Sequence, residues 1–185
     1  MKIAFFRFRL RRHLARFAQD RHGVSAVEFA MLLPLMITLY LGSVEISQGV
    51  GIDRKVTLAS RTVADLASQV SNIVNTDMTN ILNATSSVIA PYDASKLKVT
   101  VSAVTVDASS VAKIKWSCTL NGTARGVGST VTLPAALNVA NTTLVWGEVS
   151  YAYTPTIGYV VTGTLNLSDQ IFMRPRLSDS VDATC

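Results

Sequence analysis

The chain has 185 residues, with 17 basic and 12 acidic side chains and a formal net charge of +5 at pH 7. Apolar residues make up 49% of the chain and charged residues only 16%, which excludes a disordered polar chain. The length fits one domain with at most a small appendage, and the mean hydropathy of +0.33 indicates a membrane-length apolar segment.

The positive charge is concentrated at the N-terminus. Residues 1–23 hold seven basic side chains and one acidic residue, Asp20, so this leader carries +6, whereas the rest of the chain carries −1. A nucleic-acid-binding face usually spreads Lys and Arg over a folded surface or a recognition helix. The distribution therefore argues against binding to DNA or RNA.

A continuous apolar run follows the leader, from Val24 to Val44, and Glu28 is its only charged residue. As a helix these residues would extend about 31 Å, enough for the roughly 30 Å hydrocarbon core of a bilayer. We therefore predict a transmembrane helix over residues 24–48. Because basic residues favour the cytoplasmic side, the N-terminus is expected in the cytoplasm and the body outside.

A carboxylate inside a spanning helix costs about 2.5–3.5 kcal/mol at the membrane centre and less near an end. One interpretation places Glu28 at the interface, where this cost is small. In the other, the chain is cut between Gly23 and Val24, and the new Val24 ammonium neutralises Glu28 one turn away, at the positive end of the helix dipole.

Two targeting signals compete with this interpretation. A cleaved secretory signal fits poorly, because no A-x-A-like site follows the apolar run and Glu28 interrupts it. A mitochondrial presequence agrees with the Arg-rich leader but leaves Glu28 unexplained.

Residues 49–90 are predicted to form an amphipathic helical stalk that continues the membrane helix. Its apolar side chains alternate spacings of four and three, a pattern typical of one buried helix face. This stripe agrees with a coiled coil or with a helix packed on a sheet. Because the stripe is broad, it favours the helix packed on a sheet. Asn75–Asp77 supplies a capping signal for a further apolar turn from Met78. The stripe consists of Ile52, Val56, Ala59, Val63, Leu66, Val70 and Ile73.

After Pro91 the hydropathy period changes to two, which predicts an antiparallel β domain of about four strands over residues 91–185. A phase slip at Ala103–Val104 indicates a bulge in the first strand. A helical first half followed by a strand-rich second half gives an α+β fold, with the helical stripe packed on the sheet. The strands are expected near 97–104, 112–120, 145–153 and 165–173, with loops at 121–135 and 154–163.

The residue types needed for most catalytic and metal sites are missing from the body. Both histidines, His13 and His22, lie in the leader, which removes Ser-His and Cys-His nucleophiles and most His-bearing metal sites. We therefore expect no catalytic, cofactor or metal site and no enzymatic activity. An exported enzyme that uses carboxylates alone remains an open alternative.

Two cysteines, Cys118 and Cys185, lie 67 residues apart in the body. If the body is outside the cytoplasm, an even count in an oxidising compartment favours one disulfide between them. Such a bond would be worth about 2–4 kcal/mol. The alternative is an ordinary buried thiol at Cys118.

The run Gly23–Phe29 (GVSAVEF) looks like a type IV prepilin processing site, in which a glycine and four further residues precede Glu-Phe. With Pro34 and Glu45 behind it, this end of the chain resembles the TadE-like pseudopilins of the bacterial tight-adherence (Flp) pilus machinery. The segments GEVSYAYTPTIGY (147–159) and FMRPRLSDSV (172–181) resemble later parts of the same family.

The resemblance implies a type IV pilin-like fold and a role as a minor pseudopilin or assembly component of the pilus, in the context of cell adhesion and biofilms. A prepilin peptidase would cut between Gly23 and Val24. Glu28, followed by Phe29, would then pair with the N-terminal amine of a neighbouring subunit or guide assembly.

The implied partners are that peptidase, other pilins and pseudopilins, inner-membrane assembly proteins and the lipid bilayer. The expected location is the bacterial inner membrane, with a single span, a cytoplasmic N-terminus and a periplasmic body, or incorporation into a surface pilus. The alternative is an uncleaved, single-span periplasmic protein that binds or scaffolds an envelope partner.

Overall fold

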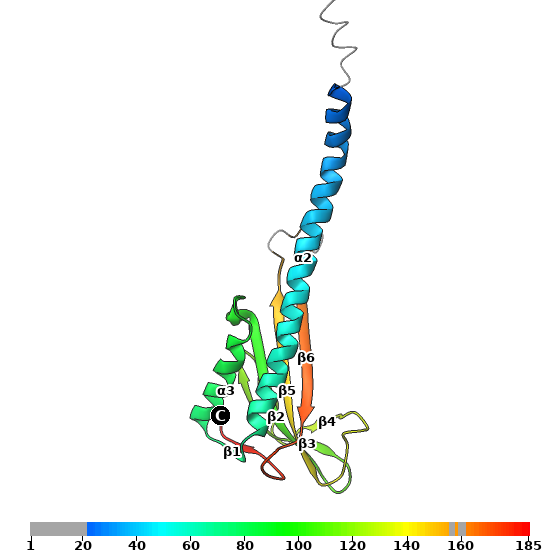
Figure 1. Cartoon of the computed structure of the whole chain (residues 1–185). Helices are drawn as coiled ribbons and strands as arrows, with labels where there is room; N and C mark the ends of the chain where they lie inside the picture. The colour runs from blue at the N-terminus through cyan, green and yellow to red at the C-terminus, as the bar shows by residue number, and fades with distance from the viewer. Residues whose placement is uncertain (1–21, 156–157, 159–161) are drawn as a thin grey trace, which may run out of the picture. The chain divides into compact units, whose positions relative to one another are not determined.

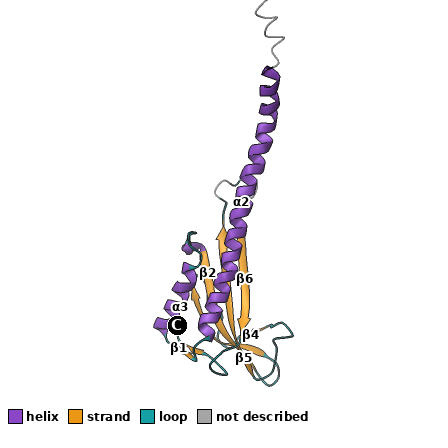
Figure 2. Ribbon diagram, viewed as in Figure 1, coloured by secondary structure: helices purple, strands orange, loops and turns teal. Residues whose placement is uncertain are grey.

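The computed structural model describes residues 22–155, 158 and 162–185, so nearly all of the leader lies outside the described residues. The chain divides into two compact units, Met1–Val44 and Glu45–Cys185. Both contain part of one long helix, α2 (His22–Ser68). All strands belong to the second unit, whose helices and sheet give the predicted α+β fold (Figures 1 and 2).

The second-unit part of α2 buries the predicted stripe against the sheet. Ile52, Val56, Ala59 and Val63 are at most 2% exposed and belong to the main core cluster together with residues of the central strands. The coiled-coil alternative is therefore wrong for this stretch, because its apolar face is covered by the protein's own sheet.

The helix ends earlier than the stripe predicted, so Val70 and Ile73 lie beyond it. The backbone N–H of Arg176 donates to the Ser68 carbonyl at 2.9 Å, at the point where α2 ends. Ile73 is instead buried from the two-residue strand β1 (Asn72–Ile73), which pairs in parallel with β7 (Asp182–Ala183).

Helix α3 (Asn75–Ser87) also contributes to the main core, through the buried side chains of Met78 and Leu82. Its N-cap is Val74, and no side chain caps it; the Met78 N–H bonds the Val74 carbonyl at 2.9 Å. The capping signal at Asn75–Asp77 was therefore misplaced, because these residues are already helical. A short 3₁₀ helix, η1 (Ala94–Lys96), leads into the sheet.

The main sheet is antiparallel, with the strand order β4-β3-β2-β5-β6. The described residues give it five strands instead of about four, because a two-residue strand, β4, forms within the predicted loop 121–135. Periodicity cannot detect a strand of two residues. The five strands are β2 (Leu97–Val106), β3 (Ala112–Leu120), β4 (Thr130–Val131), β5 (Thr142–Tyr153) and β6 (Leu165–Met173).

An irregularity at Ala103–Val104 is confirmed, but the extra residue lies in β3 and not in β2, whose side chains alternate without interruption. The β2–β3 register shifts between Ala103 and Val104, and Lys115 is the residue of β3 left without a partner. Because successive strand residues face opposite ways, Ala103 lies in the main core and Val104 in a second cluster on the other face. The second cluster includes Ile114 and Leu144, and Leu133 from the loop after β4 completes it.

Candidate processing and anchoring segment

The predicted processing residues all lie near the start of α2. Gly23, Val24, Glu28 and Phe29 are helical and exposed. A Cβ built on Gly23 would meet no atom within 4 Å, so packing does not require a glycine at this position. Four residues of helix rise about 6 Å, so Val24 and Glu28 share one face, one turn apart.

Glu28 is the only charged side chain between Val24 and Val44. Within the part of the chain that the structure describes, no ion pair or hydrogen bond involves its carboxylate. A carboxylate in this position is available to a cation, and the N-terminal ammonium of a processed chain would be one.

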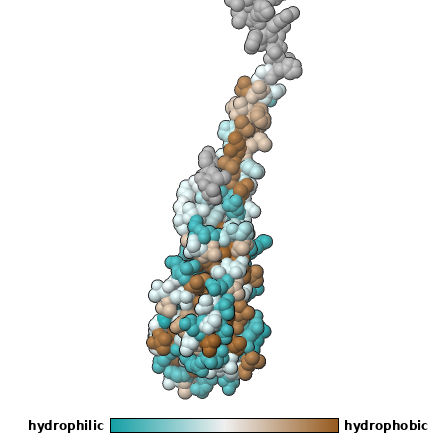
Figure 3. Space-filling model, turned by 90° about the vertical axis from the view of Figure 1, so that its left-hand side faces the viewer, coloured by the Kyte–Doolittle hydropathy of each residue, from teal (hydrophilic) through white to brown (hydrophobic). Residues whose placement is uncertain are grey.

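Figure 3 shows brown, apolar residues along the first part of α2, with paler residues between them. Between Val24 and Tyr40 the large apolar side chains are between 39% and 75% exposed. One helix among the described residues, Gly23–Ser68, is long and apolar enough to cross a membrane, with a mean hydropathy of 1.9 over its most apolar stretch. The exposed side chains include Val24, Val27, Phe29, Met31, Leu32, Leu33, Leu35, Met36, Ile37, Leu39 and Tyr40.

Pro34 lies inside this helix without ending it. Proline has no backbone N–H, so one helical hydrogen bond is missing there. The acceptor left without its helical donor is the carbonyl of Ala30, four residues earlier. The Thr38 hydroxyl donates to the Pro34 carbonyl at 2.8 Å, one turn later, and does not replace the missing bond.

Cys118 and Cys185 form the predicted disulfide, with their Cα atoms 5.7 Å apart. Cys118 is buried on β3, whereas Cys185 is exposed at the end of the C-terminal segment, residues 174–185. The same segment is also held by the Trp116 indole N–H, which donates to the Val181 carbonyl at 2.7 Å. The disulfide is thus far from the processing residues in the sequence and serves the β domain.

Two polar contacts were not predicted from the sequence. Glu45, only 2% exposed, accepts a hydrogen bond on its backbone carbonyl from the Tyr153 hydroxyl at 3.2 Å. The pKa of Tyr153 is raised, mainly because its hydroxyl is buried and to a lesser extent because of the negative charge of Glu45. The second unpredicted contact is a bidentate ion pair between Arg125 and Glu148. Hydrogen bonding to Glu148 raises the pKa of Arg125.

The sequence contained only part of the signal for these contacts. Alternation along β5 places Glu148 on the face opposite Val149, but nothing local in the loop after β3 indicates that Arg125 reaches it. Among the described residues, no three His, Cys, Asp or Glu side chains converge as a metal site would require.

Comparison with known proteins gives one match. The family model described as TadE-like protein matches residues 23–65. No curated protein and no solved structure matches the chain. The resemblance to the TadE-like family is therefore confirmed over residues 23–65, the segment that holds the Gly23–Phe29 motif and the apolar helix.

Proposed function

We propose that this protein is a minor pseudopilin or assembly component of a bacterial tight-adherence pilus, anchored by its apolar helix and processed after Gly23. The observation that carries the proposal is a coincidence of position. The TadE-like match begins at Gly23, the run of exposed apolar residues begins at Val24, and Glu28 follows one helical turn after Val24.

Processing by a prepilin peptidase gives Gly23 a role that packing does not. A Cβ would fit there without any contact, so the glycine is better explained by recognition at the cleaved bond. Cleavage would remove the +6 leader and leave Val24 with a free ammonium near Glu28. Before cleavage, the same leader would hold the N-terminus in the cytoplasm, so that the second unit lies in the periplasm.

Assembly through the apolar helix follows from the cost of Glu28 in lipid. An uncompensated carboxylate in the bilayer costs up to about 3 kcal/mol, and an ammonium on an adjacent subunit would remove much of that cost. The apolar side chains around it supply a surface for lipid and for neighbouring apolar helices. The partners are therefore other pilins, pseudopilins and inner-membrane assembly proteins.

The N-terminus of the membrane-extracted protein tests the proposal. We expect a mature chain that starts at Val24, and we expect Gly23→Ala to leave the leader attached. Ser25→Ala, two residues away in the same exposed helix, is the matched control and should be cleaved normally. An intact Met1 terminus in both variants and in the unaltered protein would instead support the uncleaved, single-span periplasmic protein.

The distribution of the mature protein then separates the two pilus roles. A component of the fibre is expected in mechanically sheared pili, whereas an assembly component should remain in the membrane fraction. Absence of any effect on piliation when the gene product is removed would contradict both roles.

A further inference from the structure

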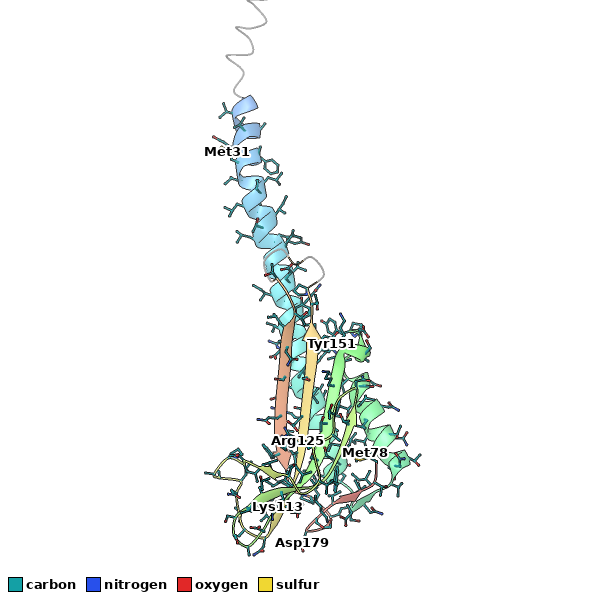
Figure 4. All side chains as sticks on the ribbon, turned by 180° about the vertical axis from the view of Figure 1, so that it is seen from behind. Met31, Met78, Lys113, Arg125, Tyr151 and Asp179 are labelled. Atoms are coloured by element: carbon teal, nitrogen blue, oxygen red, sulfur yellow. A yellow bond between two sulfur atoms is a disulfide. The ribbon has the colours of Figure 1, made fainter. Side chains whose placement is uncertain are left out.

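The face of the main sheet turned away from α2 carries a polar hollow of about 370 Å³. This volume is within the range of small-molecule sites. Figure 4 looks at this face, with the strands in front of α2 and Arg125 among them. The polar side chains of the hollow come from β2, β5 and the loop after β3: Lys98, Thr100, Thr123, Arg125, Glu148 and Ser150.

Arg125 is fixed in place from three directions. Its Nε and Nη2 donate to the two carboxylate oxygens of Glu148 at 2.7 and 2.6 Å. Its guanidinium carbon lies 4.0 Å from the centroid of the Trp146 ring, and its backbone N–H donates to the Ser117 hydroxyl at 3.0 Å. A planar guanidinium held this way is preorganised, so little entropy is lost when its remaining N–H groups bind a ligand.

Two donors in the hollow remain available. Within the described residues, Nη1 of Arg125 and the ammonium of Lys98 have no hydrogen-bond or ion-pair partner. In the register of β2 with β5, Lys98 pairs with Ser150, and Thr100, two residues further along β2, pairs with Glu148. The charges of Arg125 and Glu148 cancel, so the charge of Lys98 gives the lining of the hollow a net charge of +1.

The chemistry of the lining selects among small anions. Lys98 and Arg125 donate only, Glu148 accepts only, and the hydroxyls of Thr100, Thr123 and Ser150 do both. Inorganic phosphate would meet the cations but offers at most two hydroxyl donors to Glu148 and the neighbouring hydroxyls. A ligand with one carboxylate and several hydroxyls satisfies both kinds of group.

We propose that this hollow binds an acidic sugar of the hexuronate class. The sugar carboxylate binds Lys98 and Nη1 of Arg125. The sugar hydroxyls donate to Glu148 and exchange hydrogen bonds with the threonine and serine hydroxyls. This site belongs to the β domain and does not depend on processing after Gly23.

Titration of the full chain in detergent micelles with sodium glucuronate, followed by NMR, tests the proposal. We expect saturable shifts at residues of the hollow, with a Kd on the order of 1 mM. Lys98→Gln should raise that Kd about tenfold or more. Lys96→Gln is the matched control, because Lys96 is an exposed lysine two residues away that does not line the hollow.

Two further probes separate the ligand classes. Glucose carries the hydroxyls without the charge, and inorganic phosphate carries charge without the sugar. Both are expected to bind much more weakly than glucuronate. Equal binding of glucuronate and phosphate, an equal loss in Lys96→Gln and Lys98→Gln, or no saturable shift with glucuronate would overturn the proposal. Retained amide dispersion in each variant shows that the fold is intact.

Discussion

Gly147 of β5 lies directly against α2. A Cβ on Gly147 would lie 2.8 Å from the Ser60 carbonyl oxygen and 2.9 Å from Cγ1 of Val63. Gly147→Ala therefore forces the helix away from β5, and we expect the free energy of unfolding to fall by about 1–3 kcal/mol. Chemical denaturation of the full chain in detergent micelles measures this loss.

Gly126→Ala is the matched control, because the nearest atom to a Cβ there is Cβ of Ser129 at 4.0 Å. This variant should unfold like the unaltered protein. An equal loss of stability in both variants would contradict this explanation, because an effect of the substitution on the unfolded chain would stabilise both variants.

The side chain of Glu28 is exposed and contributes nothing to the core, so its proposed role is in assembly and not in folding. Glu28→Gln keeps the size of the side chain and removes its charge. We expect normal cleavage after Gly23 but reduced incorporation into pilus complexes, measured by N-terminal sequencing and by the size of membrane-extracted complexes. Normal assembly would show the paired-charge role to be wrong, and impaired cleavage would assign Glu28 to peptidase recognition.

At the scale of elements, the C-terminal segment is attached to α2, β1 and β3 by several independent links. The Arg176 side chain pairs with Asp65, and Lys115 pairs with Asp182 at 2.5 Å. Val181 is fully buried in the main core. The disulfide to Cys185 is thus one link among several.

Replacing both cysteines by alanine is expected to lower the free energy of unfolding by about 2–4 kcal/mol, because the unfolded chain gains freedom. The segment should nevertheless remain docked, since Val181 stays buried and the Trp116 bond stays in place. Hydrogen exchange of residues 174–185 measures this. Complete loss of protection across the segment would show that the disulfide alone holds it.

The carboxylate of Asp107 holds the turn between β2 and β3. Asp107 accepts hydrogen bonds from the backbone N–H groups of Val111 and Ser109, both at 2.9 Å. The Val111 bond is the main cause that lowers the pKa of Asp107 below 3.8. A lowered pKa in the folded state stabilises the protein above the unfolded-state pKa, and this stabilisation is lost as pH falls through the folded-state value.

We therefore expect Asp107→Asn to lower Tm near neutral pH. The difference in Tm between this variant and the unaltered protein should shrink as pH falls below 3.8, because the native carboxylate becomes protonated. Thermal denaturation over a series of pH values measures the difference. A difference that is the same at every pH would mean that the charge of Asp107 does not matter for the turn.

Across the molecule, burial follows from the sequence where one periodic face determines it. The stripe of α2 packs on the face of the sheet that carries the main core, and its first four members are buried there. Residues 112–120 show the limit of this reasoning. They alternate regularly, yet the unpaired Lys115 divides them, so Ile114 and Trp116 lie in different cores. Local periodicity does not contain the register of a partner strand.

The candidate site residues also fall into those that a local sequence pattern indicates and those that only the fold brings together. Gly23, Val24 and Glu28 are neighbours in the sequence, so a local motif was enough to find them. The contact of Tyr153 with Glu45, and that of Arg125 with Glu148, depend on how distant segments meet in the fold. Alternation along β5 gave the face of Glu148 but could not give its partner.

The two units of the chain should differ in what they need in order to be stable. All the buried members of the two core clusters lie between Ile52 and Val181, inside the second unit. We therefore expect residues 45–185, expressed alone under oxidising conditions, to be soluble without detergent and to unfold cooperatively with the disulfide formed. A chain starting at Thr57 lacks Ile52, Val56 and the Glu45 carbonyl bonded by Tyr153, and it should lose that cooperativity. Calorimetry and near-ultraviolet circular dichroism measure both outcomes. Aggregation of residues 45–185 would mean that the apolar residues before Glu45 are needed for the fold as well as for anchoring.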